Sequence, residues 1–215
     1  MNKIKNIILM GPQGCGKSTQ ADIIAKYLQI PYLSLGNILR AAVKNGTDLG
    51  QRIEPIINKG QMISDEIATS LIKEVLAEEK YQPGIILDGF PRNIKQAQAI
   101  KDSLRIDKVF NIEISDKVAI ERISGRRLCP NKHVWHLKFK PPEVENKCDI
   151  CQEELQQRKD DTEEALKTRL SFYREHTIKL LDYYEQEGKL VNFDGQKSIK
   201  EISQDLVNYL KENAG

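Results

Sequence analysis

A glycine-rich stretch near the start of the chain carries the clearest chemistry. Residues 11–19 read GPQGCGKST, between an apolar run at 7–10 and a helix-like segment at 20–28. In this context the glycines let successive backbone N–H groups point at a phosphate, and the helix N-terminus adds partial positive charge. Lys17 can reach the outer phosphates, and the Ser18 hydroxyl can ligate Mg²⁺. We therefore predict a phosphate cradle rather than a glycine turn that merely joins a strand to a helix.

Cysteines form a second group with chemical potential. Cys15 lies in the glycine-rich stretch, whereas Cys129, Cys148 and Cys151 lie close together in the sequence. A disulfide scaffold is not expected in a chain of this size without an export signal. Clustered thiols in a reducing compartment indicate a bound metal.

Length and composition describe a globular chain. Its 215 residues can bury a full core, and 40% of them are hydrophobic and 30% charged. The formal net charge of +2 does not indicate a nucleic-acid or membrane partner. The first ten residues lead straight into the glycine-rich stretch and do not resemble a signal peptide, and no run approaches the ~20 apolar residues of a membrane span. We expect a cytoplasmic protein.

Short apolar runs alternate with helical patterns along most of the chain. This alternation predicts an α/β fold whose parallel sheet is covered by helices on both faces. Its ligand site should lie at the carboxyl ends of the strands, where the glycine-rich stretch and Asp88 converge. We expect Asn37 and Asp116 to cap helices. The predicted strands are residues 7–10, 31–34, 85–88, 109–114 and 190–194, and the predicted helices are 20–28, 38–43, 49–58, 67–79, 93–104, 116–123, 160–187 and one beginning near Ser198.

Further motifs identify a family. They are residues 11–20, 39–43 (LRAAV), 87–92 (LDGFPR), Gln96, 125–127 (GRR), 158–161 (RKDD) and Arg169. With these motifs the chain closely resembles adenylate kinases over essentially its whole length. The resemblance implies the three-layer α/β fold of P-loop NTPases, with a five-stranded parallel sheet, a helical AMP-binding insertion and a small β-rich, zinc-binding lid. It implies a core at 1–33, 64–124 and 162–215, an AMP-binding domain at 34–63 and a lid at 125–161.

The implied reaction is ATP + AMP to two ADP, with Mg²⁺. A phosphate oxygen is already anionic near neutral pH, so this transfer needs positive charge, alignment and exclusion of water rather than a general base. Arginine suits that task because its planar fork can hold two phosphate oxygens. The candidate arginines lie at strand ends and at the borders of the insertions: Arg40, Arg92, Arg122, Arg126, Arg158 and Arg169.

The resemblance implies a role for each matching residue. The implied ATP-binding residues are Gly14, Cys15, Gly16, Lys17, Ser18, Thr19, Arg122, Arg126, Val134, Trp135 and Lys197. The implied AMP-binding residues are Leu35, Arg40, Gln61, Met62, Ile63, Gly89, Arg92, Gln96, Arg158 and Arg169, with Gln96 reading the adenine edge. The implied catalytic residues are Lys17, Asp88, Arg92, Arg126, Arg158 and Arg169; Asp88 would orient Mg²⁺ waters, and Ser18 would ligate the ion.

The cysteine cluster fits a lid that many bacterial members fold around Zn²⁺ with four cysteines. Here Lys132 occupies the second cysteine position and His133 follows it. A three-cysteine, one-histidine set is a known zinc solution, so we propose Cys129, His133, Cys148 and Cys151 as structural ligands. His136 is the rival nitrogen, and a metal-free lid with buried thiols is the alternative.

Two other functions are also compatible with the sequence. Leu35 replaces the small hydroxyl residue that usually contacts the AMP base, which keeps a UMP/CMP-type kinase as the nearest alternative. A nucleotide-sensing zinc ribbon that binds nucleic acid is more distant, because the chain has no basic, aromatic-studded face. The expected partners are therefore ATP, AMP and ADP, without nucleic acid or membrane. We expect a monomer, since the insertions must swing freely.

Overall fold

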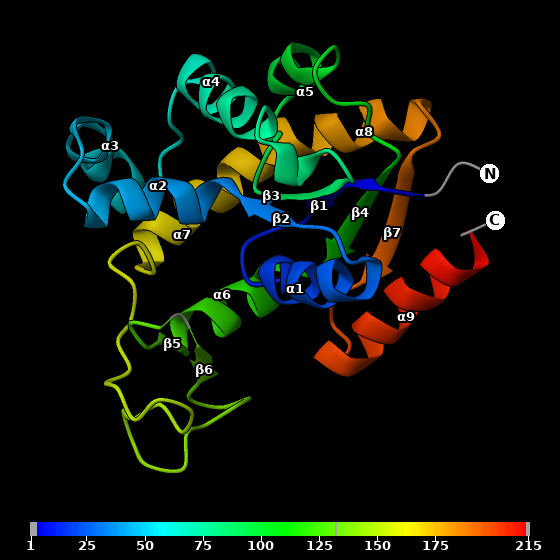
Figure 1. Ribbon diagram of the computed structural model, residues 1–215. Helices are drawn as coiled ribbons and strands as arrows, with labels where there is room; N and C mark the ends of the chain where they lie inside the picture. The colour runs from blue at the N-terminus through cyan, green and yellow to red at the C-terminus, as the bar shows by residue number, and fades with distance from the viewer. Residues whose placement is uncertain (1–3, 132, 214–215) are drawn as a thin grey trace.

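A five-stranded parallel sheet forms the centre of the computed structural model, which describes residues 4–131 and 133–213. Its strand order is β2-β3-β1-β4-β7 (Figure 1). The strands are β1 (Asn6–Met10), β2 (Tyr32–Ser34), β3 (Ile85–Asp88), β4 (Lys108–Glu113) and β7 (Leu190–Asp194). This arrangement confirms the predicted P-loop α/β fold class and the five predicted strands.

Helices cover both faces of the sheet, as its apolar strands require. Ile7 and Leu9 of β1 pack into one buried cluster with α1 (Lys17–Leu28) and α9 (Ile199–Glu212). Ile8 and Met10, which point the other way, pack into a second cluster with α4 (Asp65–Leu76), α5 (Ile94–Ile100) and α8 (Ile178–Gln186). The alternation of β1 thus fixes which helices lie on which side.

Two segments extend from this core near the C-terminal ends of the strands. The first holds α2 (Leu35–Lys44) and α3 (Asp48–Asn58), which pack against each other. The second follows α6 (Asp116–Ser124) and holds the antiparallel pair β5 (Arg126–Leu128) and β6 (Val134–His136). In Figure 1 this second segment hangs below α6 and returns to the core through α7 (Glu163–Phe172). We keep the predicted boundaries of the two inserted domains, 34–63 and 125–161, as a proposal.

Several predicted helix ends are wrong. Asn37 lies inside α2, whose N-cap is Ser34, and Ser115 rather than Asp116 caps α6. The helix predicted to reach residue 79 ends at Leu76, and the one predicted for 93–104 ends at Ile100. The long helix predicted for 160–187 begins after Thr162 and contains a π-helical turn, Tyr173–Thr177, between α7 and α8.

No helix within the described residues is long and apolar enough to cross a membrane.

Candidate functional site

The glycine-rich stretch links β1 to α1 at the C-terminal edge of the sheet. Gly14 has a φ of 83°, a left-handed conformation that favours glycine. A Cβ on Gly11 would lie 2.3 Å from the Ile112 carbonyl oxygen, so the loop needs glycine there to pass close to β4. The Lys17 Nζ donates to the Gly11 and Pro12 carbonyl oxygens at 2.7 and 2.8 Å, which holds the ammonium group over the loop.

The Ser18 hydroxyl and the Asp88 carboxylate meet beside this loop. β1 pairs with β3 so that Leu9 lies opposite Asp88, which brings the end of β3 next to the start of α1. The Ser18 hydroxyl donates to Asp88 Oδ2 at 2.7 Å, and Asp88 is buried. A hydroxyl and a carboxylate are oxygen ligands of the kind Mg²⁺ prefers, so the pair fits a magnesium ion that arrives with a nucleotide.

One pocket lies between α2, α4 and the turn after β3. Its lining combines apolar side chains with the guanidinium groups of Arg40, Arg92 and Arg169, which suits a molecule that joins a flat base to a phosphate. The lining residues are Leu35, Gly36, Leu39, Arg40, Ile57, Gly60, Gln61, Met62, Ile63, Ala68, Arg92, Gln96, Asp160 and Arg169.

A second pocket continues from the first toward the glycine-rich loop. Met62, Arg92 and Arg169 line both pockets, and Lys17 lines only the second. The remaining residues of the second pocket are Leu9, Met10, Gly11, Gln13, Gly89, Pro91, Phe172, Tyr173 and Thr177. Arg92 and Arg169 therefore lie at the junction between the first pocket and the glycine-rich loop.

Buried positive charge accumulates at this junction. Burial, with the charges of Arg169 and Arg40, lowers the pKa of Arg92 to about 10 against the opposing effect of Asp88. Burial, with the charges of Arg126 and Arg40, likewise lowers the pKa of Arg158 to about 10. Arg92 and Arg158 therefore stay cationic at neutral pH, and each would be stabilised by an anion. Clustered guanidinium groups of this kind can bind a phosphate.

Two adjacent aspartates hold the remaining arginines. Asp161 is buried and accepts from Arg126 Nε at 2.9 Å, and the Arg126 Nη2 atom lies 2.6 Å from its Oδ1. Asp160 pairs with Arg169 Nη1 at 3.2 Å, and Arg40 lies 4.0 Å from the same carboxylate. Neither aspartate is among the predicted site residues, although both lie in the RKDD motif.

Arg92 is positioned by contacts from separate elements. Its Nε donates to the Gly89 carbonyl oxygen at 2.8 Å, and its own carbonyl oxygen accepts from the Thr177 hydroxyl at 3.0 Å. Thr177 lies in the π-helical turn, a feature that often marks functional sites. The sequence did not reveal this turn, because its apolar spacing stays close to that of an α-helix.

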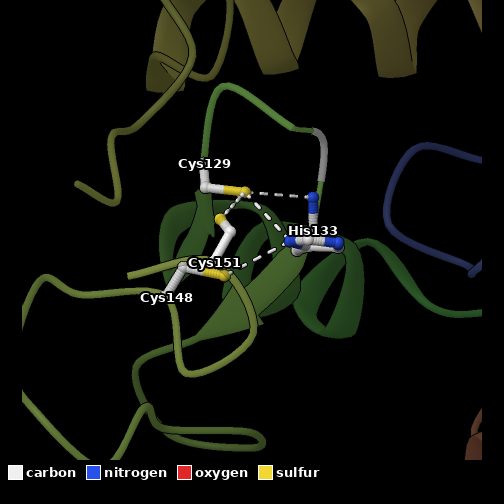
Figure 2. A group of neighbouring side chains, drawn as sticks. All are labelled: Cys129, His133, Cys148 and Cys151. Atoms are coloured by element: carbon white, nitrogen blue, oxygen red, sulfur yellow. Dashed lines mark hydrogen bonds between the residues drawn. The ribbon is translucent and has the colours of Figure 1, made fainter. Parts of the chain in front are cut away.

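Cys129, His133, Cys148 and Cys151 come together in the second inserted segment (Figure 2). Their ligand atoms all lie within 4.8 Å of one another. The His133 Nδ1 lies 3.3 Å from Cys129 Sγ and 3.4 Å from Cys148 Sγ. Sulfurs around a tetrahedral zinc at ~2.3 Å are roughly 3.8 Å apart, so this donor set is close to the spacing that zinc needs.

The environment of Cys148 favours the thiolate that a metal requires. Burial raises the pKa of this thiol, but hydrogen bonds from the backbone N–H groups of Cys151 and Ile150 and from Trp135 outweigh it and lower the pKa to about 6. The indole Nε1 of Trp135 donates to Cys148 Sγ at 3.3 Å. His136 lies outside the cluster, where its Nδ1 accepts from the backbone N–H groups of Lys138 and Phe139 at 3.0 and 3.1 Å.

Four other residues that the resemblance assigns to ATP make contacts of their own in this structure. Trp135 is buried among the cysteines with Lys140 over its ring at 4.4 Å, whereas Val134 is exposed. Lys197 pairs with Asp205 at 2.7 Å. Arg122 packs beside the loop at Gly14 and donates to the Gly195 carbonyl oxygen at 2.8 Å.

The parallel sheet, the glycine-rich loop after β1 and its lysine and serine define a P-loop nucleotide-binding protein of the α/β class. The sequence profile of the adenylate kinase family matches residues 9–189. The adenylate kinase of Methanosarcina barkeri is 44% identical over 214 residues, covering 97% of this chain and 100% of the relative. That of Bacillus licheniformis is 43% identical over 211 residues, covering 95% and 97%. The chain belongs to the adenylate kinase family, whose members are phosphotransferases.

Proposed function

We propose that the chain transfers the terminal phosphoryl group of Mg²⁺-bound ATP to AMP, giving two ADP, and runs the same step in reverse. ATP would bind with its phosphates over residues 14–19, and AMP would occupy the pocket lined by α2 and α4. The observation that carries this proposal is the junction of the two pockets, where Arg92 and Arg169 line both and Lys17 faces them from the loop.

The arginines would supply most of the catalysis. Arg92 and Arg40 would hold the AMP phosphate, while Arg169, Arg126 and Arg158 would neutralise charge on the moving phosphoryl group. Asp160 and Asp161 would keep these guanidinium groups aligned, since their carboxylates bind the arginines from the side. No proton has to leave the acceptor phosphate, so the site has no need of a general base.

Lys17 and the backbone N–H groups of residues 14–19 would hold the ATP phosphates. Lys17 would exchange its carbonyl contacts for phosphate oxygens when ATP binds. Mg²⁺ bound with ATP supplies neutralising charge at the phosphates, with Ser18 and Asp88 as the residues that would hold it or its waters. Val134, Trp135, Arg122 and Lys197 remain proposals for the adenine end of ATP.

The pocket assigned to AMP would recognise the nucleoside mainly by shape. Leu35, Met62 and Ile63 would enclose the base, Gln61 would contribute backbone, and Gln96 would contact the base edge. Gly89, which lines the adjoining pocket, would contribute backbone at the junction. Leu35 offers no hydroxyl to the base, so the side-chain amide of Gln96 would supply the polar contact that reads the base edge.

The three cysteines and His133 would bind one structural Zn²⁺. The set supplies four protein ligands and leaves no open position, which suits a structural rather than a catalytic ion. The buried cluster of this segment is small, consisting of Cys129, Trp135, Cys148 and Leu155 with Cys151 packed against it. A segment with so few apolar residues needs a metal to fold stably.

We further propose that the protein acts in the cytoplasm as a monomer. Free thiols that ligate a metal persist in a reducing compartment. A monomer leaves both inserted segments free to close over the nucleotides, which excludes water from the reaction.

Mixing experiments test the proposed reaction. With Mg²⁺ present, ADP should form when ATP and AMP are supplied together and should not form at a comparable rate from ATP alone. Chelating the Mg²⁺ should stop turnover, because ATP would then lack its neutralising ion. ADP formation from ATP alone at the same rate would instead identify a hydrolase and contradict the proposal.

A further inference from the structure

Gln96 lies buried at the wall of the AMP pocket with its side-chain amide held at both ends. It is 4% exposed and lies in the first turn of α5. Its Oε1 accepts from the Arg92 backbone N–H at 2.8 Å. Its Nε2 donates to Asp65 Oδ1 at 2.7 Å.

These two contacts determine which way the amide points. A backbone N–H can only donate and a carboxylate can only accept, so both partners demand the same orientation of Gln96. Asp65 also accepts from Asn93 Nδ2 at 2.8 Å. That bond holds the Asp65 carboxylate in place. The Oδ1 of Asn93 accepts from the Gln96 backbone N–H at 2.9 Å, which caps α5.

The oriented amide keeps one N–H and one lone pair for a ligand. Adenine offers a ring nitrogen that accepts beside an amino group that donates, whereas a 6-oxopurine offers the reverse pattern of a ring N–H beside a carbonyl oxygen. A rotated amide would swap the positions of its donor and acceptor and would suit the 6-oxopurine instead. When the pocket walls hold the base in place, the direction of this amide therefore decides whether a 6-aminopurine or a 6-oxopurine can form both hydrogen bonds.

We propose that Asp65 is a specificity-determining positioning residue, which holds the Gln96 amide in the direction that accepts a 6-aminopurine and rejects a 6-oxopurine. The proposal rests on the proposed function, since it concerns the pocket assigned to AMP. Asp65 does not line that pocket and acts through Gln96.

AMP and IMP are the matched acceptors for the test, because they differ only at the six-position and its neighbouring ring nitrogen. Replacing Asp65 with alanine should lower the ratio of kcat/KM for AMP to that for IMP by about tenfold, because the amide can then rotate. The KM for ATP should stay unchanged. The ratio is measured in one sample, so it does not depend on how much of the protein is folded.

Three further variants separate orientation from helix stability. Asp65→Asn keeps an acceptor for Gln96 and should restore most of the selectivity. Glu66→Ala removes an exposed acid from the same first turn of α4 and should leave the ratio unchanged. If Asp65→Ala is insoluble, Asp65→Ser has a hydroxyl too short to reach Gln96 and should show the same loss.

The AMP/IMP ratios of these variants decide whether Asp65 sets the direction of the Gln96 amide. An unchanged AMP/IMP ratio in Asp65→Ala or Asp65→Ser, or an equal loss in Glu66→Ala, would overturn it. Failure of the unaltered protein to use AMP would instead overturn the proposed function, so the two failures are distinguishable.

Discussion

Replacing Arg92 with alanine is expected to reduce kcat/KM for AMP by about a thousandfold or more. Arg92 lines both pockets, and burial together with neighbouring arginines already lowers its pKa to about 10. The hydrogen bond from its Nε to the Gly89 carbonyl oxygen orients this buried charge before substrate binds. Loss of one such group from a phosphoryl-transfer site typically costs about two to five orders of magnitude. Steady-state kinetics with varied AMP and saturating ATP measures the loss.

Matched variants separate charge from geometry in this experiment. Arg52→Ala removes an exposed arginine from α3 and should keep near-normal kinetics. Arg92→Lys keeps the charge but loses the planar fork, so it should recover only part of the activity. Near-normal turnover in Arg92→Ala would show that the phosphate binds elsewhere.

Replacing Cys148 with serine is expected to remove the metal and destabilise the lid. The unaltered protein, prepared without chelator, should carry about one Zn²⁺ per chain. The variant should carry almost none, because Cys148 is fully buried at the centre of the donor set and hydroxyls are poor zinc ligands. Its melting temperature should fall by about 5 °C or more, and turnover should drop because Arg126 and Arg158 border the same segment.

Two histidine variants identify the fourth ligand. His133→Ala should lose most of the zinc, since His133 Nδ1 lies near two of the sulfurs. His136→Ala should retain it, since His136 is engaged with the backbone of Lys138 and Phe139. Elemental analysis decides between them, and zinc loss only in His136→Ala would reverse the assignment.

The core of the fold follows from the sequence because its signals are local and strong. Short apolar runs such as 85–88 can be buried on both faces only in a sheet that helices cover on both sides. The glycine-rich stretch predicts the turn from the first strand to the first helix. The caps were harder to predict. Asn37 is a good capping residue, yet Ser34 at the end of β2 begins α2 three residues earlier, and Asn37 instead accepts from Arg40 Nη2 at 2.8 Å.

Other features depend on contacts between distant segments and have no local signal. The pairing of Arg126 with Asp161 joins the two borders of the lid. The place of Trp135 in the motif predicts a position over the ATP base, but it gives no sign that the indole also donates to Cys148. The resemblance supplies the candidate residues. It does not say which charged side chains pair, because that depends on how the inserted segments pack against the core.

An acceptor panel tests the central claim most directly. Initial rates are measured with Mg²⁺, saturating ATP and equal concentrations of AMP, UMP, CMP or GMP, with ADP formation as the readout for AMP and consumption of ATP as the common readout. We predict that AMP is the preferred acceptor by a wide margin, because the oriented Gln96 amide and the apolar side chains of the pocket suit adenine. A preference for UMP or CMP, or no transfer to any monophosphate, would contradict it.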